Sequence, residues 1–376
     1  MTDWLNKTHV GDCRVLMRRM IAQGVRVNCV VTSPPYWGLR EYGMPGQFGL
    51  ESSWQRHVAR MRGVFRLVRE LLAEDGTLWL NYGDCYAGAP GGWQGKNGQR
   101  ASRTFTARIA HHKKGRVRDR GTKQQSNLGS DFRGAPHRQG HPDLKPKDLV
   151  GMPWRVALAL QDDGWWLRSE IIWEKPNPMP ESITDRPTKA HEHIFLLARS
   201  ERYYYDGESI RDPASWQSHE RAARARLTGY APPGQTPHKG IAGPRAGVNP
   251  KARAHGNNGV GFGHGYDAKP KPRVKQNSSF SEAVIDLVET RNARTIWRIP
   301  TQPFSGAHFA TFPEALAARC IVAGSRPGDV VLDPFMGSGT TGQVATDLGR
   351  CFIGCELNPE YVELHELRRT TTGMPI

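Results

Sequence analysis

The stretch VLDPFMGSGTT, residues 331–341, joins an apolar strand to a helix through a turn that contains two glycines. Glycine lets a backbone approach a ligand closely, and the free N–H groups at the start of the helix can receive a carboxylate or a phosphate. Glu356 ends the next expected strand, at about the spacing where doubly wound folds hold ribose hydroxyls. These features predict a cradle for a nucleotide-like cofactor, and by themselves they also suit a dinucleotide such as NAD.

Short apolar segments alternate with amphipathic ones over much of the chain. The expected strands are residues 28–33, 77–82, 167–173, 193–198, 330–333 and 351–356. The expected helices are one that ends near Gly76, residues 153–160, 313–323 and 340–348, and a final helix capped by Asn358 and Pro359. This alternation predicts an α/β domain with a doubly wound, mostly parallel, Rossmann-like sheet.

A second motif, TSPPYW at residues 32–37, follows an expected strand at the sheet edge where open α/β folds bind ligands. Pro34 and Pro35 stiffen the backbone and lack N–H donors, so neighbouring carbonyl groups can accept hydrogen bonds from an amino group. Ser33 adds a hydroxyl group and Tyr36 adds an aromatic ring. Acceptors at Ser33 and the Pro34 carbonyl favour a tetrahedral amine nitrogen, whose lone pair can attack an activated methyl group in line. The motif therefore predicts methylation of an exocyclic amine.

The two motifs together resemble those of the DNA amino methyltransferases, which make N4-methylcytosine or N6-methyladenine. Their order, with SPPY first and DPFMGSGTT near the C-terminus, is similar to the permuted beta class of that family. The resemblance covers most of the chain and implies S-adenosyl-L-methionine as the cofactor, with no metal. It also implies double-stranded DNA as the substrate, with the target base flipped out of the duplex and stacked on Tyr36.

The resemblance also assigns roles by position. Asp12 matches the acidic residue near the cofactor adenine, with a helix cap as the structural alternative, while Phe335 and the segment 309–313 match the wall of the cofactor pocket. Asp333 is expected to hold the cofactor's amino group. WEKP, residues 173–176, matches a strand-end motif near the flipped base, although as bare sequence it indicates a structural role. The predicted catalytic residues are Ser33, Pro34, Pro35 and Tyr36, and the predicted cofactor-binding residues are Asp12, Phe312, Asp333, Phe335, Gly337, Ser338, Gly339, Thr340 and Glu356.

Positive charge is concentrated in two stretches rich in Gly, Pro and polar residues. Residues 88–147 carry a net charge of +11 and residues 221–275 a net charge of +10, within an overall charge of +16, so the rest of the chain is net negative. Clustered Lys and Arg indicate a polyanionic partner, and interleaved aromatic side chains can stack on bases. Solvated linkers are the structural alternative for both stretches.

The expected organisation is a catalytic domain interrupted by two insertions. In chain order, we expect an N-terminal catalytic segment (residues 1–87), a basic insertion (residues 88–147), a continued catalytic segment (residues 148–204), a target-recognition region (residues 205–290) and a cofactor-binding segment (residues 291–376).

Other sequence features limit the classes of protein that fit. No segment is apolar for long enough to span a bilayer and the first residues lack a leader pattern, so we expect a cytoplasmic protein that does not act at a membrane. The six cysteines form no CxxC pair and are expected to be reduced structural thiols. None follows a proline, which disfavours methylation of cytosine carbon 5, because the enzymes of that reaction carry their nucleophilic thiolate after a proline.

Ser33 favours the N4 atom of cytosine as the target, because adenine enzymes of the family more often have Asp or Asn at that position. An N6-adenine DNA methyltransferase is the runner-up. A non-catalytic nucleic-acid-binding module and a dinucleotide-dependent oxidoreductase are weaker alternatives, and RNA is a less favoured substrate. A homodimer and a companion restriction nuclease are further partners that the residues leave undecided, as is the recognition sequence.

Overall fold

The computed structural model describes residues 3–88, 143–178, 180–213, 290–301, 313–363 and 365. Its contacts divide the chain into two units, of which the larger combines Met1–Ile210 with Arg294–Ile376 and the smaller is Arg211–Ala293. Most of the predicted basic insertion at 88–147 and of the predicted target-recognition region at 205–290 lies outside the described residues. Their boundaries therefore stay predictions.

In the smaller unit, the two ends of the segment pair with each other. Strands β6 (Asp212–Pro213) and β7 (Thr290–Arg291) are antiparallel. Arg211 donates hydrogen bonds to the Thr290 Oγ1 at 2.8 Å and to the Asn292 Oδ1 at 3.1 Å. The first and last residues of this unit are therefore joined by hydrogen bonds.

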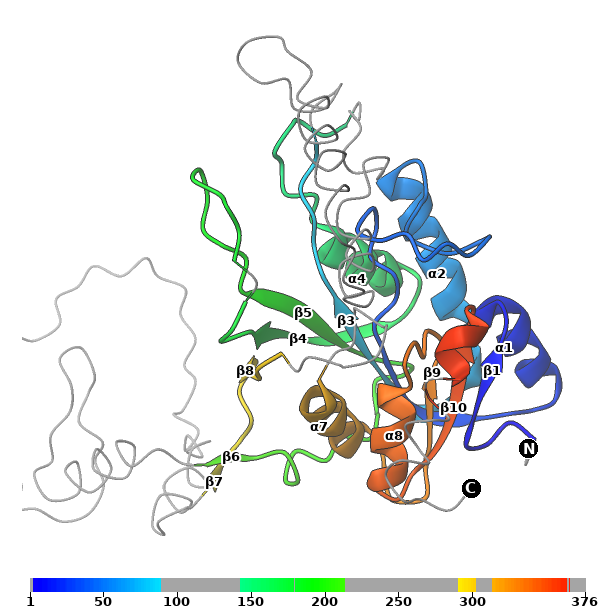
Figure 1. Cartoon of the computed structure of the whole chain (residues 1–376). Coiled ribbons are helices and arrows are strands. Elements are labelled where there is room, and N and C mark those ends of the chain that lie inside the picture. Colours follow the sequence, from blue (N-terminus) through cyan, green and yellow to red (C-terminus); the bar gives the residue numbers. More distant parts are fainter. Residues whose placement is uncertain are drawn as a thin grey trace, which may run out of the picture. The chain divides into compact units, whose positions relative to one another are not determined.

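The strands of the larger unit form one eight-stranded sheet in the order β1-β10-β9-β2-β3-β5-β4-β8 (Figure 1). The strands are β1 (Lys7–Val10), β2 (Val27–Thr32), β3 (Leu72–Tyr82), β4 (Trp166–Glu174), β5 (His191–Ala198), β8 (Ile296–Arg298), β9 (Val330–Asp333) and β10 (Cys351–Glu356). Neighbouring strands are parallel except where β5 pairs with β3 and with β4. The predicted doubly wound, mostly parallel Rossmann-like sheet is confirmed.

Helices cover both faces of this sheet. The helices are α1 (Cys13–Ala22), α2 (Trp54–Leu71), α4 (Met152–Asp162), α7 (Glu314–Gly324) and α8 (Thr340–Asp347). Side chains alternate along β3, so Leu78 and Leu80 pack in the core with α1, α2 and α4, while Thr77 and Trp79 lie against α7 on the opposite face. Among the residues that the structure describes, no helix is long and apolar enough to cross a membrane.

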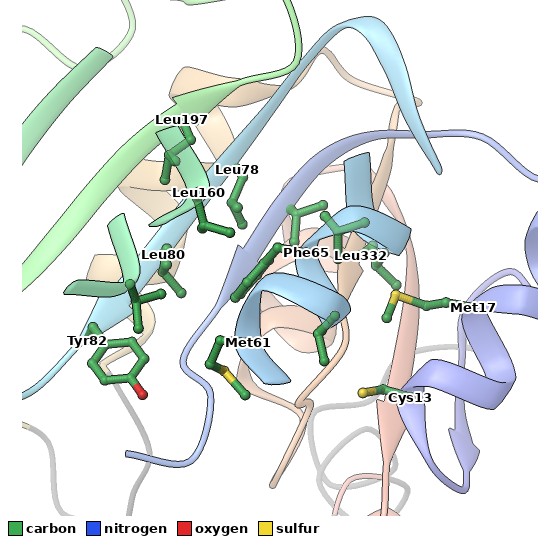
Figure 2. Packing of buried hydrophobic residues seen from close by; sticks show 14 of the residues in the cluster. Cys13, Met17, Met61, Phe65, Leu78, Leu80, Tyr82, Leu160, Leu197 and Leu332 are labelled. Atoms are coloured by element: carbon green, nitrogen blue, oxygen red, sulfur yellow. The ribbon is translucent and has the colours of Figure 1, made fainter. Parts of the chain in front are cut away.

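The main core lies under α1, α2 and α4. Met61, Phe65 and Val68 recur at helical spacing on α2 and are all buried. Figure 2 shows Phe65 and Met61 packed among Leu160 of α4 and side chains from the central strands. Because the central strands are anchored by this packing, their carboxyl ends are held in a fixed arrangement.

Several boundaries differ from the sequence predictions. Strands β9 and β10 start and end at the predicted residues, but β1, α1 and β8 were not predicted. Helix α2 ends at Leu71 rather than near Gly76, and Leu72 already has an extended backbone in β3. Leu72 is buried, and an apolar residue at this position fits the end of the helical period as well as the start of a buried strand.

All six cysteines are free. Cys13, Cys29 and Cys85 are buried, and burial raises the pKa of each thiol to about 12. They therefore remain protonated packing residues at neutral pH.

Two glycines provide a matched test of the packing between α7 and the sheet. A Cβ atom at Gly324 would lie 2.5 Å from the Trp79 Nε1 and 2.7 Å from the Thr77 Oγ1, whereas one at Gly63, in α2, would meet no atom within 4 Å. We expect Gly324→Ala to lower the free energy of unfolding by about 1–3 kcal/mol because it overpacks this contact. Gly63→Ala should raise it by about 0.5–1 kcal/mol because alanine is the better helix former.

Urea unfolding of both variants measures this difference. Equal effects of the two substitutions would show that α7 does not pack on β3 as described.

Candidate active site

The two sequence motifs meet at the carboxyl ends of the neighbouring parallel strands β2 and β9. The chain leaves β2 through α2 towards β3 on one side, and leaves β9 through α8 towards β10 on the other side. Such a reversal of direction opens a crevice between the strand ends. A cavity of about 850 Å³ lies there, and both motifs line it. The expected convergence of the two motifs on one cleft is confirmed.

A buried hydrogen bond joins the motifs directly. The Thr32 Oγ1 donates to the Asp333 Oδ1 at 2.6 Å. The same carboxylate accepts from the Thr341 Oγ1 at 2.7 Å and from the Phe335 backbone N–H at 2.9 Å. Burial raises the pKa of Asp333 to about 6, against the lowering effect of these three bonds.

Asp333 itself does not line the cavity and is only 1 % exposed. Its carboxylate is directed to Thr32, Thr341 and the turn backbone, not to the open space where a cofactor would lie. This placement differs from the expectation that Asp333 holds the cofactor's amino group. In the structure it holds the turn and the end of β2 together.

The glycine turn has the predicted shape of a cradle. Gly337 has φ 54° and Gly339 has φ 82°, a left-handed conformation at the N-cap of α8. The Gly337 N–H donates to the Glu356 Oε2 at 2.8 Å. Ser338 and Thr340 line the cavity, and the Ser338 Oγ is buried without a hydrogen-bond partner among the described residues. This unsatisfied hydroxyl, beside the start of a helix that borders the cavity, fits a ligand that carries a carboxylate.

Two acidic residues, Asp12 and Glu356, also line the cavity. Glu356 ends β10, accepts from the Asn358 N–H at 2.8 Å, and has its pKa raised by burial. Its bonded oxygens retain lone pairs that can accept from hydroxyl groups. Asp12 caps α1 by accepting from the Arg14 N–H at 2.8 Å, and the hydrogen bonds from Arg14 hold the pKa of Asp12 below its ordinary value. Asp12 is thus both the helix cap and a residue of the cavity wall.

Aromatic side chains form another wall of the cavity. Phe335 contacts Phe48 edge to face, with 5.5 Å between the ring centroids. Phe48 was not predicted, and it is held between the guanidinium groups of Arg14 and Arg60 at 5.2 and 4.2 Å. The predicted Phe312 lies outside the described residues.

Ser33, Pro34, Pro35 and Tyr36 all line the same cavity. The Ser33 Oγ and the Tyr36 Oη lie 3.1 Å apart. One side of the Tyr36 ring packs on Tyr82, with 5.0 Å between centroids, and on the backbone of Gly83. The predicted catalytic motif is therefore fixed against β3.

A buried network supports Tyr82 from behind. Its hydroxyl is hydrogen-bonded to the His57 Nε2, and the His57 Nδ1 lies 2.6 Å from the Glu51 Oε2. Glu51 also accepts from Arg60 at 2.6 Å, and its backbone carbonyl accepts from the Trp37 indole at 2.8 Å. The loop after the SPPY motif is thus tied to the core through Glu51.

A polar cluster that the sequence did not predict lies at the hydroxyl of Tyr36. The Tyr36 Oη donates to the Glu192 Oε2 at 2.7 Å, and the Asn81 Nδ2 lies 3.0 Å from both oxygens. The Lys175 Nζ pairs with the Glu192 Oε1 at 2.5 Å. Asn81, Lys175 and Glu192 lie at the ends of three different strands, so no local sequence pattern marks them as a group. Only Lys175 belonged to a motif, WEKP, that the sequence had singled out.

Lys189 is a second missed cation of the cavity wall. Its Nζ donates to the Asp84 carbonyl at 2.7 Å, and burial lowers the pKa of its ammonium group.

Comparison with known proteins identifies the family of this chain. A family model described as DNA methylase, for enzymes acting at N6 or N4, matches residues 27–367. The Type II methyltransferase M.SmaI of Serratia marcescens is 38% identical over 362 residues, which cover 96% of this chain and 90% of that protein. The Type II methyltransferase M.Cfr9I of Citrobacter freundii is 38% identical over 358 residues, covering 94% of this chain and 84% of that protein.

A solved structure supports the fold. The PvuII DNA methyltransferase, described as cytosine-N4-specific, superposes with a TM-score of 0.50 at 15% identity, covering 98% of this chain and 89% of its own. At that identity the likeness concerns the fold alone. The family match and the close relatives establish that this chain belongs to the N6/N4 DNA methylase family and is an S-adenosylmethionine-dependent DNA methyltransferase.

Proposed function

We propose that this protein transfers a methyl group from S-adenosylmethionine to the N4 atom of cytosine at a specific site in double-stranded DNA. The observation that carries the proposal is the Thr32–Asp333 hydrogen bond of 2.6 Å, which holds the SPPY motif beside the glycine turn. A base at the first motif and a cofactor at the second would then share one cavity of about 850 Å³.

The cofactor-binding residues are proposed from the cavity wall. Ser338, whose Oγ is unsatisfied, and Thr340 line the cavity at the start of α8 and would bind the methionine carboxylate, while Gly337 and Gly339 give the turn its shape. Glu356 would accept hydrogen bonds from the ribose hydroxyls.

Asp12 and Phe335 would lie beside the adenine, together with the predicted Phe312. Asp333 would act on this site through the turn that it holds, because its carboxylate is occupied by three hydrogen bonds. When bound, S-adenosylmethionine supplies an electrophilic methyl group on a sulfonium ion.

The SPPY residues would activate the target amine. The lone pair of an aryl amine is delocalised into the base, so the amine is a weak nucleophile in its planar form. The Ser33 Oγ and the Pro34 carbonyl would accept the two amine hydrogens and favour a tetrahedral nitrogen. The ring of Tyr36 would stack on the flipped base and align it. Positioning of this kind lowers the activation barrier of methyl transfer, because the entropic cost of bringing the reactants together is met on binding.

Ser33 supports cytosine as the target, and N6 of adenine is the competing assignment. The relatives' description as Type II methyltransferases supports a role in a restriction–modification system with a companion nuclease that cleaves the unmodified site. The region 205–290 is proposed to read that site, and the basic insertion 88–147 to contact the DNA backbone.

Identification of the product tests the target atom. After incubation of the purified protein with unmodified genomic DNA and isotope-labelled S-adenosylmethionine, the DNA is digested to nucleosides and analysed by mass spectrometry. We expect labelled N4-methylcytosine, and sequencing of the modified DNA gives the recognition site. Labelled N6-methyladenine would replace the cytosine assignment, and 5-methylcytosine would refute the proposed chemistry.

Substitutions in the SPPY motif should separate methyl transfer from cofactor binding. We expect Ser33→Ala and Pro34→Ala to lower kcat by about 100-fold or more, because each change weakens the acceptor arrangement around the amine. The Kd for S-adenosylmethionine, measured by calorimetry, should stay near the wild-type value. A parallel loss of cofactor affinity would contradict this division of labour.

Asp333→Asn should affect both functions, because Asp333 holds both motifs. An amide in place of the carboxylate puts an N–H₂ group against the Phe335 N–H or the hydroxyl donors, which costs about 1–3 kcal/mol for an unpaired buried group. We expect weaker cofactor binding together with a lower kcat. Asp347→Asn, at the exposed end of α8, is the control and should change neither quantity.

A further inference from the structure

Glu192 is the centre of a hydrogen-bonded cluster that the proposed chemistry does not use. Its Oε2 accepts from the Tyr36 hydroxyl at 2.7 Å and from the Asn81 amide at 3.0 Å. Its Oε1 pairs with the Lys175 ammonium at 2.5 Å. The side chains of Glu192 and Lys175 are 15 % and 20 % exposed, so the pair is largely removed from solvent. An ion pair in such a place needs its hydrogen bonds satisfied, and here three neighbours satisfy Glu192.

The protonation states of the cluster are set by its own members. Burial by itself raises the pKa of Glu192, but Lys175 and the hydrogen bond from Tyr36 bring that pKa below its ordinary value. Burial and the nearby Glu192 charge raise the pKa of Tyr36 well above its ordinary value. Tyr36 therefore stays a hydroxyl donor and Glu192 stays an ionised acceptor at neutral pH.

Lys175 is itself held by a second contact. Its ammonium group lies 4.4 Å from the centroid of the Trp173 ring, and the Trp173 indole donates to the Ile299 carbonyl at 2.8 Å. Lys175, which pairs with Glu192, is thus positioned by Trp173, a residue of β4 where that strand pairs with β8.

The Tyr36 ring is constrained at two places. The Tyr36 ring packs on Tyr82, and Gly83 lies close to it, since a Cβ atom at position 83 would be 2.5 Å from the Tyr36 Cε2. At the tip of the ring, Glu192 and Asn81 hold the hydroxyl. Tyr36 remains half-buried and lines the cavity, so its uncovered portion faces the space where a base would enter.

We propose that Glu192 is a positioning residue, which fixes the Tyr36 ring through its hydroxyl as the platform for the flipped base, with Lys175 and Asn81 holding Glu192 in place. This inference rests on the proposed function of the same cavity. A ring fixed in advance lets the target base stack in the reactive orientation without ordering the side chain during catalysis.

A double-mutant cycle tests whether Glu192 acts through the Tyr36 hydroxyl. The variants are Tyr36→Phe, which keeps the ring and removes the hydroxyl, Glu192→Gln, and the two together. The substrate is a duplex that carries the mapped recognition site, with tritiated S-adenosylmethionine. We expect each single substitution to lower kcat roughly tenfold, and the double variant to be at most about twofold slower than either, because both changes act on the one Tyr36–Glu192 hydrogen bond, which Tyr36→Phe removes and Glu192→Gln weakens by removing the charge.

The Kd values for DNA and for S-adenosylmethionine should stay near wild type in all three variants, which a general loss of structure would not allow. Glu170→Gln is the matched control, because Glu170 pairs with His193 at 2.7 Å on the same two strands but does not line the cavity. It should retain the wild-type kcat. Glu192→Leu, which also removes the side-chain oxygen that accepts from Tyr36, should be slower than Glu192→Gln.

Effects of Tyr36→Phe and Glu192→Gln that multiply in the double variant would overturn the inference, since Glu192 would then act on the base or the fold independently. The inference also fails if Glu192→Gln lowers the melting temperature and cofactor affinity as strongly as kcat. A wild-type protein that methylates no DNA would instead refute the proposed function, so the two failures are distinguishable.

Discussion

Thr32 and Asp333 are 301 positions apart in the sequence, yet their side chains share a hydrogen bond of 2.6 Å in the interior. The bond is possible because β2 and β9 are neighbours and parallel, so both strands end at the same edge of the sheet. A carboxylate at this depth is costly unless its oxygens are bonded, and Asp333 has three donors around it. The position of each motif relative to the other depends on this constraint.

The sheet order explains why a cavity opens at that point. Strands are added from β9 towards β10 and β1 in one direction, and from β2 towards β3 and β5 in the other. The connecting helices diverge on either side, and the space between the strand ends is left to a ligand. The glycine turn and Glu356 line one part of the cavity, and the SPPY segment lines another. The methyl donor and its acceptor can therefore be bound by different halves of one fold.

Tyr36 connects this site to two buried polar networks. Behind its ring, Tyr82 is tied through His57 to Glu51; at its hydroxyl, Glu192 bridges to Lys175. Buried polar networks of this kind specify one arrangement of side chains more sharply than apolar packing does, because a displaced member leaves its partner unsatisfied. One network contacts the ring of Tyr36 and the other its hydroxyl, so the SPPY segment is held at two places.

The sequence by itself determined the local elements and the motifs. The glycine turn, with φ of 54° and 82°, and the strands β9 and β10 follow from short segments of sequence, whose conformation depends on neighbours in the chain. The SPPY motif is likewise visible in a short segment. The family follows from the same segments. Only the tertiary structure decided that Asp333 faces Thr32 rather than the cavity, and that Asn81, Lys175 and Glu192 surround Tyr36. Those contacts join ends of separate strands, and the order in which strands pair is fixed by packing of the whole sheet, which no short stretch of sequence contains.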